Sequence, residues 1–233
     1  MKILALDTAT EACSAALAVE GRVLARSELA GRSHTERLVP MVHSLMAEAG
    51  LSYAQLDGYV CGIGPGSFAG VRIGLGFMKG LALAADRPAV GVSSLEMLAL
   101  PALEAGAARV LAVIDARMSE VYWAGFEPDA SGLPQVVVEE QVGLPQALPR
   151  RTEVDWTGVG TGWGRYEPVL CEALGQRPLR IVGDVLPQAA DALRIGLPRL
   201  RDGAGLSLDQ LVPRYLRNKV ALTLTEQQAL RQR

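Results

Sequence analysis

The sequence predicts an α/β protein made of two lobes that share one duplicated plan. The first observation is a short apolar run that closes on Asp7, turns through a hairpin and continues as a second strand. The second is the same succession about a hundred residues later, where residues 110–114 close on Asp115. The third is that helical spacing of apolar residues follows these hairpins. Strands followed by helices in both halves are typical of layered α/β folds.

The first half begins with strands and a helix whose limits are marked by capping residues. The predicted strands, in chain order, are residues 3–6, 13–19, 23–29, 58–63 and 89–92. Ser33 and Glu36 form a capping-box pair that opens the first helix, and Gly50 ends it. The apolar positions of this helix recur on one wide face, which consists of Leu38, Met41, Val42, Leu45, Met46 and Ala49.

A glycine-rich turn joins the fourth strand to the second helix, and two interpretations of it compete. Gly62, Gly64 and Gly66 surround Pro65, and Ser67 offers its side-chain oxygen as a helix cap. Free backbone N–H groups at a helix N-terminus could hold a phosphate. The glycine spacing matches neither the P-loop nor the dinucleotide-binding pattern. A structural turn that permits close packing is therefore favoured.

The second helix contains several glycines, each of which costs about 1 kcal/mol relative to alanine. Gly70 and Gly74 share one face, whereas Gly76 and Gly80 share another face with Ala84. Small residues at this spacing let another backbone approach closely. We therefore expect the helix to pack on two sides, against its own sheet and against a second helix that could belong to another chain.

The second half repeats the plan more loosely. Its predicted strands are residues 110–114, 121–126, 135–139 and 154–159. Its predicted helices are residues 166–174 and 188–195, and a second glycine-rich turn is expected at residues 160–164. We expect an N-terminal lobe of residues 1–105, a smaller C-terminal lobe of residues 106–220, and a polar tail of residues 221–233 that is helical or frayed.

The composition excludes several classes of protein. Of 233 residues, 49% are hydrophobic and 21% are charged, which excludes general disorder. The net charge of −2 argues against unaided binding of nucleic acid. The chain from Arg177 onward has ten basic and five acidic residues, and could line an RNA path built with a partner. Three scattered cysteines without a C-x-x-C pair predict neither a disulfide framework nor a zinc site.

The ends and the histidines add further expectations. Lys2 is followed by only four apolar residues before Asp7, too few for a signal peptide, and no membrane contact is expected. A cytoplasmic protein is the resulting expectation. His34 and His43 are nine residues apart and cannot form a metal pair on one helix, so a surface or interface role is expected for His34. Neither a metal site nor a cofactor is predicted.

A strand that ends in Asp and enters a Thr-containing hairpin resembles the actin, hexokinase and Hsp70 fold, which is ribonuclease H-like. In that fold two such carboxylates face a nucleotide and its magnesium between the lobes. A degenerate nucleotide site here would use Asp7, Thr8, Thr10 and Asp115. The hairpins of that fold carry glycine two residues after the Asp, whereas this chain has Ala9 and Arg117. Both phosphate loops are therefore expected to be compromised.

Motifs along nearly the whole chain are similar to those of the bacterial TsaB (YeaZ) family. They are I-L-A-L-D-T-A-T at residues 3–10, H-T-E-R-L at 34–38 followed by Pro40, G-P-G-S-F-A-G-V-R-I-G at 64–74, G-V-S-S-L-E at 91–96, D-A-R-M-S-E-V-Y at 115–122 and P-R-Y-L-R at 213–217. The glycine stretch with its trailing R-I-G is highly specific. Where the family usually has Thr after Phe68, this chain has Ala69.

The resemblance implies a non-catalytic subunit of the complex that forms threonylcarbamoyladenosine at position 37 of tRNAs reading codons that start with A. It implies that the paralogue TsaD carries the metal site and transfers the threonylcarbamoyl group, and that TsaE is a small ATPase of the same complex. It also implies pairing with TsaD through two helices of the N-terminal lobe, and a homodimer through the same surface when TsaD is absent. The tRNA would be bound only through the complex.

By position, the partner-binding helices would be the one that starts at Ser33 and the one that contains Gly70. The residues assigned to this contact are His34, Leu38, Met41, Val42, Leu45, Met46, Gly70, Arg72, Gly74, Phe77, Met78 and Leu81. Two rival functions are an ATP- and magnesium-dependent enzyme of actin-like fold, which would use Asp7 and Asp115, and a peptidase. The sequence supplies no metal pair and no nucleophile–base couple for a peptidase.

Overall fold

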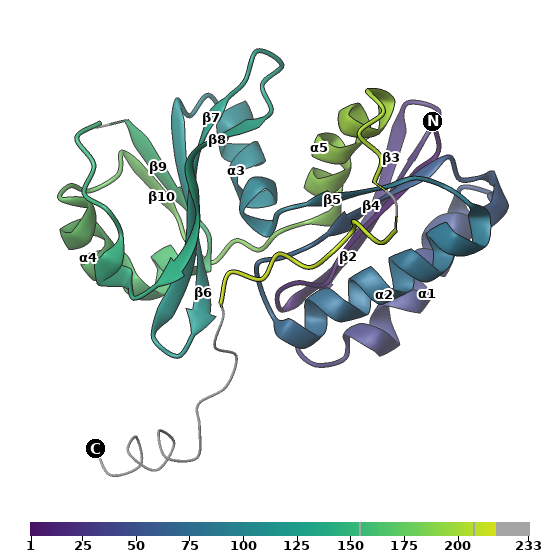
Figure 1. The fold of residues 1–233 in the computed structure, drawn as a ribbon, viewed down its shortest axis with the longest axis horizontal. Helices are drawn as coiled ribbons and strands as arrows, with labels where there is room; N and C mark the ends of the chain where they lie inside the picture. The colour runs from purple at the N-terminus through teal and green to yellow at the C-terminus, as the bar shows by residue number, and fades with distance from the viewer. Residues whose placement is uncertain (154, 207, 218–233) are drawn as a thin grey trace, which may run out of the picture.

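The computed structural model describes residues 1–153, 155–206 and 208–217, which form two lobes side by side (Figure 1). The polar tail predicted at residues 221–233 lies outside them. The strand order is β3-β2-β1-β4-β5 in the first sheet and β8-β7-β6-β9-β10 in the second, read from the matching edge. In both sheets the first three strands along the chain pair antiparallel, and the other pairs are parallel. The duplicated two-lobe fold predicted from the sequence is confirmed.

The elements have the following bounds. The first sheet consists of β1 (Ile3–Asp7), β2 (Ala12–Val19), β3 (Arg22–Leu29), β4 (Gly58–Gly62) and β5 (Ala89–Val92). The second consists of β6 (Arg109–Arg117), β7 (Glu120–Pro128), β8 (Pro134–Gly143), β9 (Trp156–Val159) and β10 (Arg180–Val182). The α-helices are α1 (His34–Glu48), α2 (Phe68–Ala85), α3 (Ser94–Glu104), α4 (Thr161–Leu174) and α5 (Ala189–Arg201), and short 3-10 helices are η1 (Tyr53–Gln55) and η2 (Pro145–Ala147). Every predicted strand overlaps one of these strands.

The helices differ from the sequence-based prediction at three places. α3 has no counterpart among the predicted elements, although Ser93 and Glu96 form a capping box at its start. The glycine-rich turn expected at residues 160–164 is wrong, because α4 begins at Thr161. Ser33 is the N-cap residue of α1, but its side chain makes no cap hydrogen bond, so the predicted capping box is wrong there.

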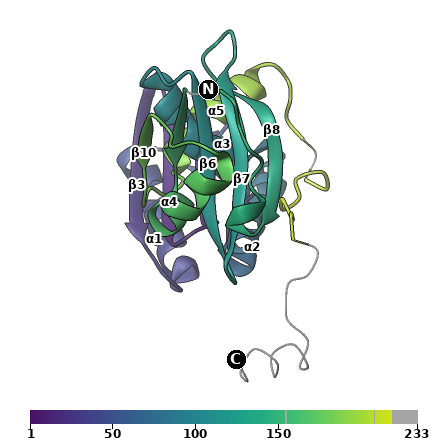
Figure 2. The ribbon, with the colours of Figure 1, turned by 90° about the vertical axis from the view of Figure 1, so that its left-hand side faces the viewer.

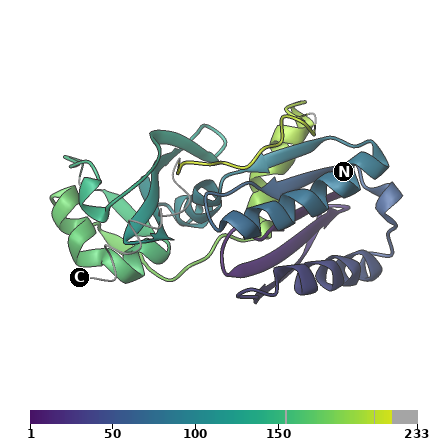
Figure 3. The ribbon, with the colours of Figure 1, turned by 60° about the horizontal axis from the view of Figure 1, so that its bottom comes forward.

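Helices cover both faces of each sheet. α1 and α2 lie side by side on one face of the first sheet, and α5 covers the other (Figure 3). α3 and α4 cover opposite faces of the second sheet, with α4 in front in Figure 2. The expected division into residues 1–105 and 106–220 separates the sheets but not the helices, because α3 packs on the second sheet and α5 on the first. The chain thus crosses between the lobes before α3 and again before α5.

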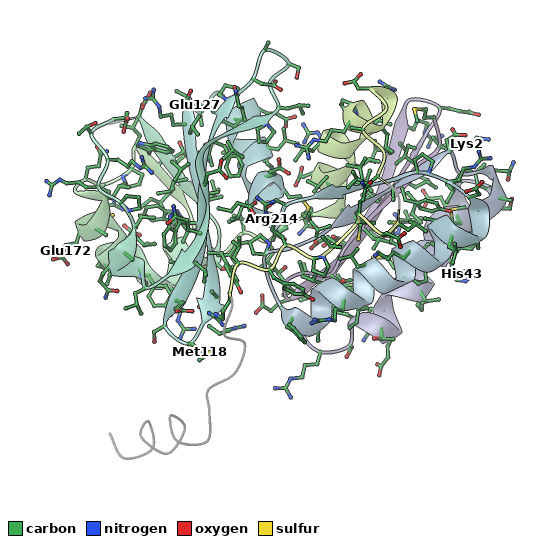
Figure 4. The ribbon with its side chains drawn as sticks, in the orientation of Figure 1. Lys2, His43, Met118, Glu127, Glu172 and Arg214 are labelled. Atoms are coloured by element: carbon green, nitrogen blue, oxygen red, sulfur yellow. The ribbon has the colours of Figure 1, made fainter. Side chains whose placement is uncertain are left out.

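A C-terminal segment, residues 208–217, crosses from the first lobe to the second and is called the strap below. The N–H group of Arg214 donates to the carbonyl of Ile63 in the first lobe (2.8 Å). The guanidinium of Arg214 binds Glu140 of β8 (2.6 Å), and that of Arg217 binds Glu120 of β7. Figure 4 shows Arg214 between the two lobes. The strap therefore ties the lobes together.

The position of α2 depends on two glycines that face β1. A Cβ atom at Gly70 would overlap the carbonyl oxygen of Thr8, and one at Gly74 would lie 2.6 Å from Thr8 Oγ1. The Thr8 hydroxyl donates to the carbonyl of Gly70 (2.7 Å). By contrast, a Cβ atom at Gly76 or Gly80 would have no neighbour within 4 Å. One of the two small-residue faces therefore packs on the chain's own sheet, as predicted, and the other is open.

By length and composition alone, α2 could also cross a membrane. It carries Arg72 and Lys79, however, and its inner face is buried in the core through Val71, Leu75 and Met78. The core helix of a protein without any membrane contact passes the same test, so the match is weak evidence for a membrane span.

The two glycine faces of α2 should respond to alanine in opposite directions. Gly70→Ala forces α2 away from Thr8, and we expect it to lower the free energy of unfolding by about 1–3 kcal/mol. Gly76→Ala, the matched control on the open face, should raise it by about 0.5–1 kcal/mol, because alanine favours the helix. Urea denaturation of the two variants measures both changes. Equal effects at the two positions would contradict the packing of α2 on β1.

Candidate functional site

A cleft of about 560 Å³ lies between the lobes, where the two Asp-containing hairpins meet. Its walls come from the turn after β1, the β6–β7 hairpin, the start of α2 and the strap. Figure 4 shows Met118 at the tip of the β6–β7 hairpin. Both hairpins of the possible degenerate nucleotide site thus border one cleft, and the chemistry of their side chains decides what the cleft can bind.

Asp7 does not face this cleft. Its carboxylate is fully buried, a Cβ atom at Gly62 would overlap Oδ1, and Oδ1 has no hydrogen-bond partner among the described residues. Oδ2 accepts a hydrogen bond from the N–H of Ala9 (3.3 Å). Burial raises the pKa of Asp7 from its ordinary 3.8 to about 7, although the Ala9 hydrogen bond acts to lower it. Asp7 is thus not among the residues that line the cleft, which disfavours a role for it in the possible degenerate nucleotide site.

Asp115 does line the cleft, but cations already compensate it. Its Oδ2 lies 3.1 Å from a guanidinium nitrogen of Arg165 and 3.5 Å from one of Arg117. Its Oδ1 accepts a hydrogen bond from the N–H of Arg117 (3.0 Å). The Asp115 carboxylate is therefore held by the protein's own cations and is a poor ligand for hydrated magnesium, which disfavours the rival ATP-dependent enzyme.

Arg117 occupies the position that glycine takes in a phosphate loop, and it keeps a glycine-like backbone. Its φ is +61°, and the next two residues, Met118 and Ser119, have φ of +55° and +61°. This conformation costs about 1–2 kcal/mol for a residue with a side chain. The Arg117 guanidinium crosses to the opposite hairpin and forms an ion pair with Glu11. An ion pair within the chain therefore joins the two hairpins that would otherwise hold phosphate.

The threonines of the first hairpin are also directed inward. Thr8 is buried and bound to Gly70, and the Thr10 hydroxyl is buried without a partner among the described residues. The carbonyl of Thr10 accepts a hydrogen bond from Nε2 of His34 (2.8 Å). His34 is buried, so its predicted surface position is wrong. This histidine instead fixes the start of α1 to the hairpin.

The glycine-rich turn packs against the same hairpin. Ser67 caps α2 by accepting from the N–H of Gly70 (3.3 Å), and its own N–H donates to the carbonyl of Ala9 (2.6 Å). A Cβ atom at Gly66 would overlap that carbonyl. Within the described part of the chain, no group of three or more His, Cys, Asp or Glu could hold a metal ion. These contacts favour the structural interpretation of the turn over the phosphate cradle.

Most residues predicted to bind a partner lie inside the first lobe. Nine of the twelve are buried: His34, Leu38, Met41, Val42, Leu45, Met46, Gly70, Gly74 and Met78. Gly70 and Gly74 face Thr8. The wide stripe of α1 is buried in a core shared with the sheet and α2, so these residues pack within the lobe. Of the others on α2, Arg72 is exposed and Phe77 and Leu81 are half-buried.

The open side of α2 is a better candidate for a contact surface. We define the outer face of α2 by Gly76, Gly80, Leu83 and Ala84. Leu83 is 74% exposed, and neither glycine has a neighbour near its Cβ position. A large apolar side chain beside two glycines allows a second helix to approach closely. The glycine spacing in the sequence distinguishes two faces of α2. The predicted partner-binding residues include Gly70 and Gly74 of the inner face and do not include Leu83.

Comparisons with known proteins agree over nearly the full chain. Residues 25–155 match the family model described as TsaD, tRNA N6-adenosine threonylcarbamoyltransferase. The chain is 42% identical to the tRNA threonylcarbamoyladenosine biosynthesis protein TsaB of Escherichia coli, covering 95% of this chain and 96% of that one. The Haemophilus influenzae protein of the same name is 38% identical, with coverage of 94% and 95%.

Two solved structures from Pseudomonas aeruginosa are also similar. YeaZ has a TM-score of 0.85 and 43% identity, covering 92% of this chain and 99% of that one. The other has the same TM-score and identity, covers 93% of this chain and 99% of that one, and is described as an uncharacterized protein with similarity to peptidase YEAZ. The likeness extends over both lobes and therefore includes the cleft and α2.

The buried Asp7 should make stability depend on pH. Because its folded pKa of about 7 lies above the ordinary 3.8, the folded state holds its proton more tightly than the unfolded state. Protonation of Asp7 contributes on the order of 4 kcal/mol to the free energy of unfolding below pH about 4. This contribution is lost as the pH rises through about 7. Asp7→Asn should remove this part of the pH dependence. Urea denaturation between pH 4 and 8 tests it, and identical slopes for variant and wild type would contradict it.

Proposed function

The chain belongs to the TsaB (YeaZ) family, and we propose that it is a non-catalytic subunit of the complex that forms threonylcarbamoyladenosine at position 37 of tRNAs reading codons that start with A. In this proposal it binds and activates the paralogue TsaD, and the ATPase TsaE joins the same complex. When TsaD is absent, the same surface forms a homodimer. The names of the relatives, which match over nearly their full length, support the pathway.

The observation that carries the proposed contact is the outer face of α2. Among the described residues, a Cβ atom at either glycine would meet no neighbour within 4 Å, and Leu83 beside them is largely exposed. Glycine costs about 1 kcal/mol relative to alanine at each such helical position. No contact with another described residue offsets this cost, and a partner helix packed against these positions would explain it.

The match to the TsaD family model supports a related partner. Two chains of one fold can pair through equivalent helices, which gives a pseudo-symmetric heterodimer in one case and a symmetric homodimer in the other. In both cases each chain would present the same helix face. A partner docked on α2 would be positioned relative to the first lobe as a whole, because Gly70 and Gly74 hold α2 rigidly on β1.

The chemistry of the cleft supports a role in binding rather than in catalysis. Asp7 is buried behind Gly62, Asp115 is compensated by two arginines, and Arg117 reaches across to Glu11. The groups that would handle magnesium and phosphate in an actin-like enzyme are thus engaged within the protein. The chain would then contribute by ordering TsaD for its reaction.

A bulky residue on the outer face of α2 should prevent pairing with TsaD. Gly80→Arg places a charged side chain in the centre of the proposed contact, and we expect affinity for TsaD to fall by at least 2 kcal/mol, about 30-fold. Because the position is open, the variant should fold, and its thermal unfolding curve checks this. Co-purification with tagged TsaD measures the pairing, and tRNA modification by the reconstituted complex should fall with it.

A matched control separates the contact from a general effect of adding arginine. Leu179→Arg changes a side chain that is 75% exposed in the second lobe, away from α2, and should leave pairing unchanged. Stoichiometric co-purification of folded Gly80→Arg with TsaD would show that the outer face of α2 is not the contact.

A further inference from the structure

Two half-exposed aromatic rings mark the mouth of the cleft at the start of α2. Phe68 and Tyr215 are 49% and 50% exposed, and their ring centroids lie 5.9 Å apart at an interplanar angle of 31°. The guanidinium of Arg72 lies 3.3 Å from the centroid of the Phe68 ring and 5.1 Å from that of Tyr215. Phe68 and Arg72 belong to α2, whereas Tyr215 belongs to the strap. The fold therefore assembles this cluster from segments that are distant in the sequence.

Uncompensated positive charge accompanies these rings. Arg32 lines the cleft together with Phe68 and Tyr215. Among the residues that the structure describes, neither Arg32 nor Arg72 has a carboxylate partner, whereas Arg117, Arg214 and Arg217 each bind a glutamate. The paired arginines join parts of the protein to one another. The two free ones leave their charge available to a ligand.

We propose that Arg32, Phe68, Arg72 and Tyr215, named here the arginine–aromatic patch, bind a single-stranded segment of RNA. Aromatic rings stack on bases of any sequence, and guanidinium groups bind phosphates. Arg72 uses one N–H group to donate to the carbonyl of Phe68 (3.2 Å), which leaves its other donors for a phosphate. The cleft behind the patch, about 560 Å³, is large enough to admit an unstacked base.

The composition and position of the patch favour RNA over a protein partner. Its charged groups are donors only, and the carboxylates nearby, Glu11 and Asp115, are neutralised by arginines. The outer face of α2 adjoins the patch, since Arg72 and Gly76 are one helical turn, about 6 Å, apart at the helical rise per residue, whereas Leu83 lies about 22 Å from Phe68. A protein docked around Gly80 and Leu83 would lie next to the patch, so an RNA strand on the patch would contact both chains.

This inference rests on the proposed function, which supplies the tRNA and the partner. With a net charge of −2, the chain is not expected to hold RNA alone at physiological salt. In a complex with TsaD, the patch would add contacts to a strand that the partner also binds. The anticodon loop is the part of a tRNA that offers unstacked bases next to position 37, and it is the segment that we assign to the patch.

The test uses the complex of the full chain with TsaD and a fluorescent tRNA transcript, titrated at several salt concentrations. Arg32→Ala and Arg72→Ala should each raise the Kd about tenfold and lower the slope of log K against log salt by about one. Tyr215→Ala should raise the Kd about tenfold and leave the slope unchanged, because it removes stacking alone. The control is Arg201→Ala, an exposed arginine at the end of α5, which should change neither quantity.

The outcomes distinguish this inference from the proposed function. If all variants bind TsaD and tRNA as the wild type does, the inference is overturned and the proposed function stands. If the patch variants lose TsaD while the affinity of the remaining complex for tRNA is unchanged, the patch is a protein contact and the inference is again overturned. If the wild-type chain binds no TsaD, the proposed function fails, and the variants are compared on the chain alone at low salt, where equal affinities would refute the RNA surface separately.

Discussion

The close approach of α2 to β1 is the constraint on which the rest of the structure depends. Thr8 lies between Gly70 and Gly74, and its hydroxyl donates to the carbonyl of Gly70 (2.7 Å). No residue with a side chain fits at Gly70 without moving the helix. This contact fixes the rotation of α2 about its own axis. Because α2 cannot rotate, Gly76 and Gly80 must point away from the sheet, which creates an outer face that none of the described residues covers.

The same close packing accounts for the altered hairpins. The turn before α2 lies on the first hairpin, where the N–H of Ser67 donates to the carbonyl of Ala9 (2.6 Å), and Gly62 encloses the Asp7 carboxylate. The second hairpin instead uses the side chain of Arg117, which reaches Glu11 across the cleft. Neither hairpin keeps the open backbone that a phosphate requires. The polar groups of both hairpins thus hold the protein together.

The sequence predicts local features of this fold well and non-local ones poorly. The strands and their duplication follow from apolar runs that close on Asp7 and Asp115, and these are local signals. α3 packs on the second sheet and α5 on the first, although each is adjacent in sequence to the other lobe. This depends on the path of the chain in space, and the spacing of apolar residues in the sequence does not reveal it. The same limit affects α1, because its wide stripe is buried against two neighbours in one core. The glycine spacing in the sequence distinguishes two faces of α2, but only the contact with Thr8 shows which of the two faces is internal.

The strap explains how the cleft keeps its shape without a nucleotide. In an actin-like fold a bound nucleotide contacts both lobes, so it can set the angle between them. Here Arg214 joins Ile63 of the first lobe to Glu140 of the second, and Glu140 also binds Ser93 at the start of α3. The Glu140 side chain is only 4% exposed, so its charge requires these partners. Because the strap joins both lobes, it places Tyr215 beside Phe68 at the cleft.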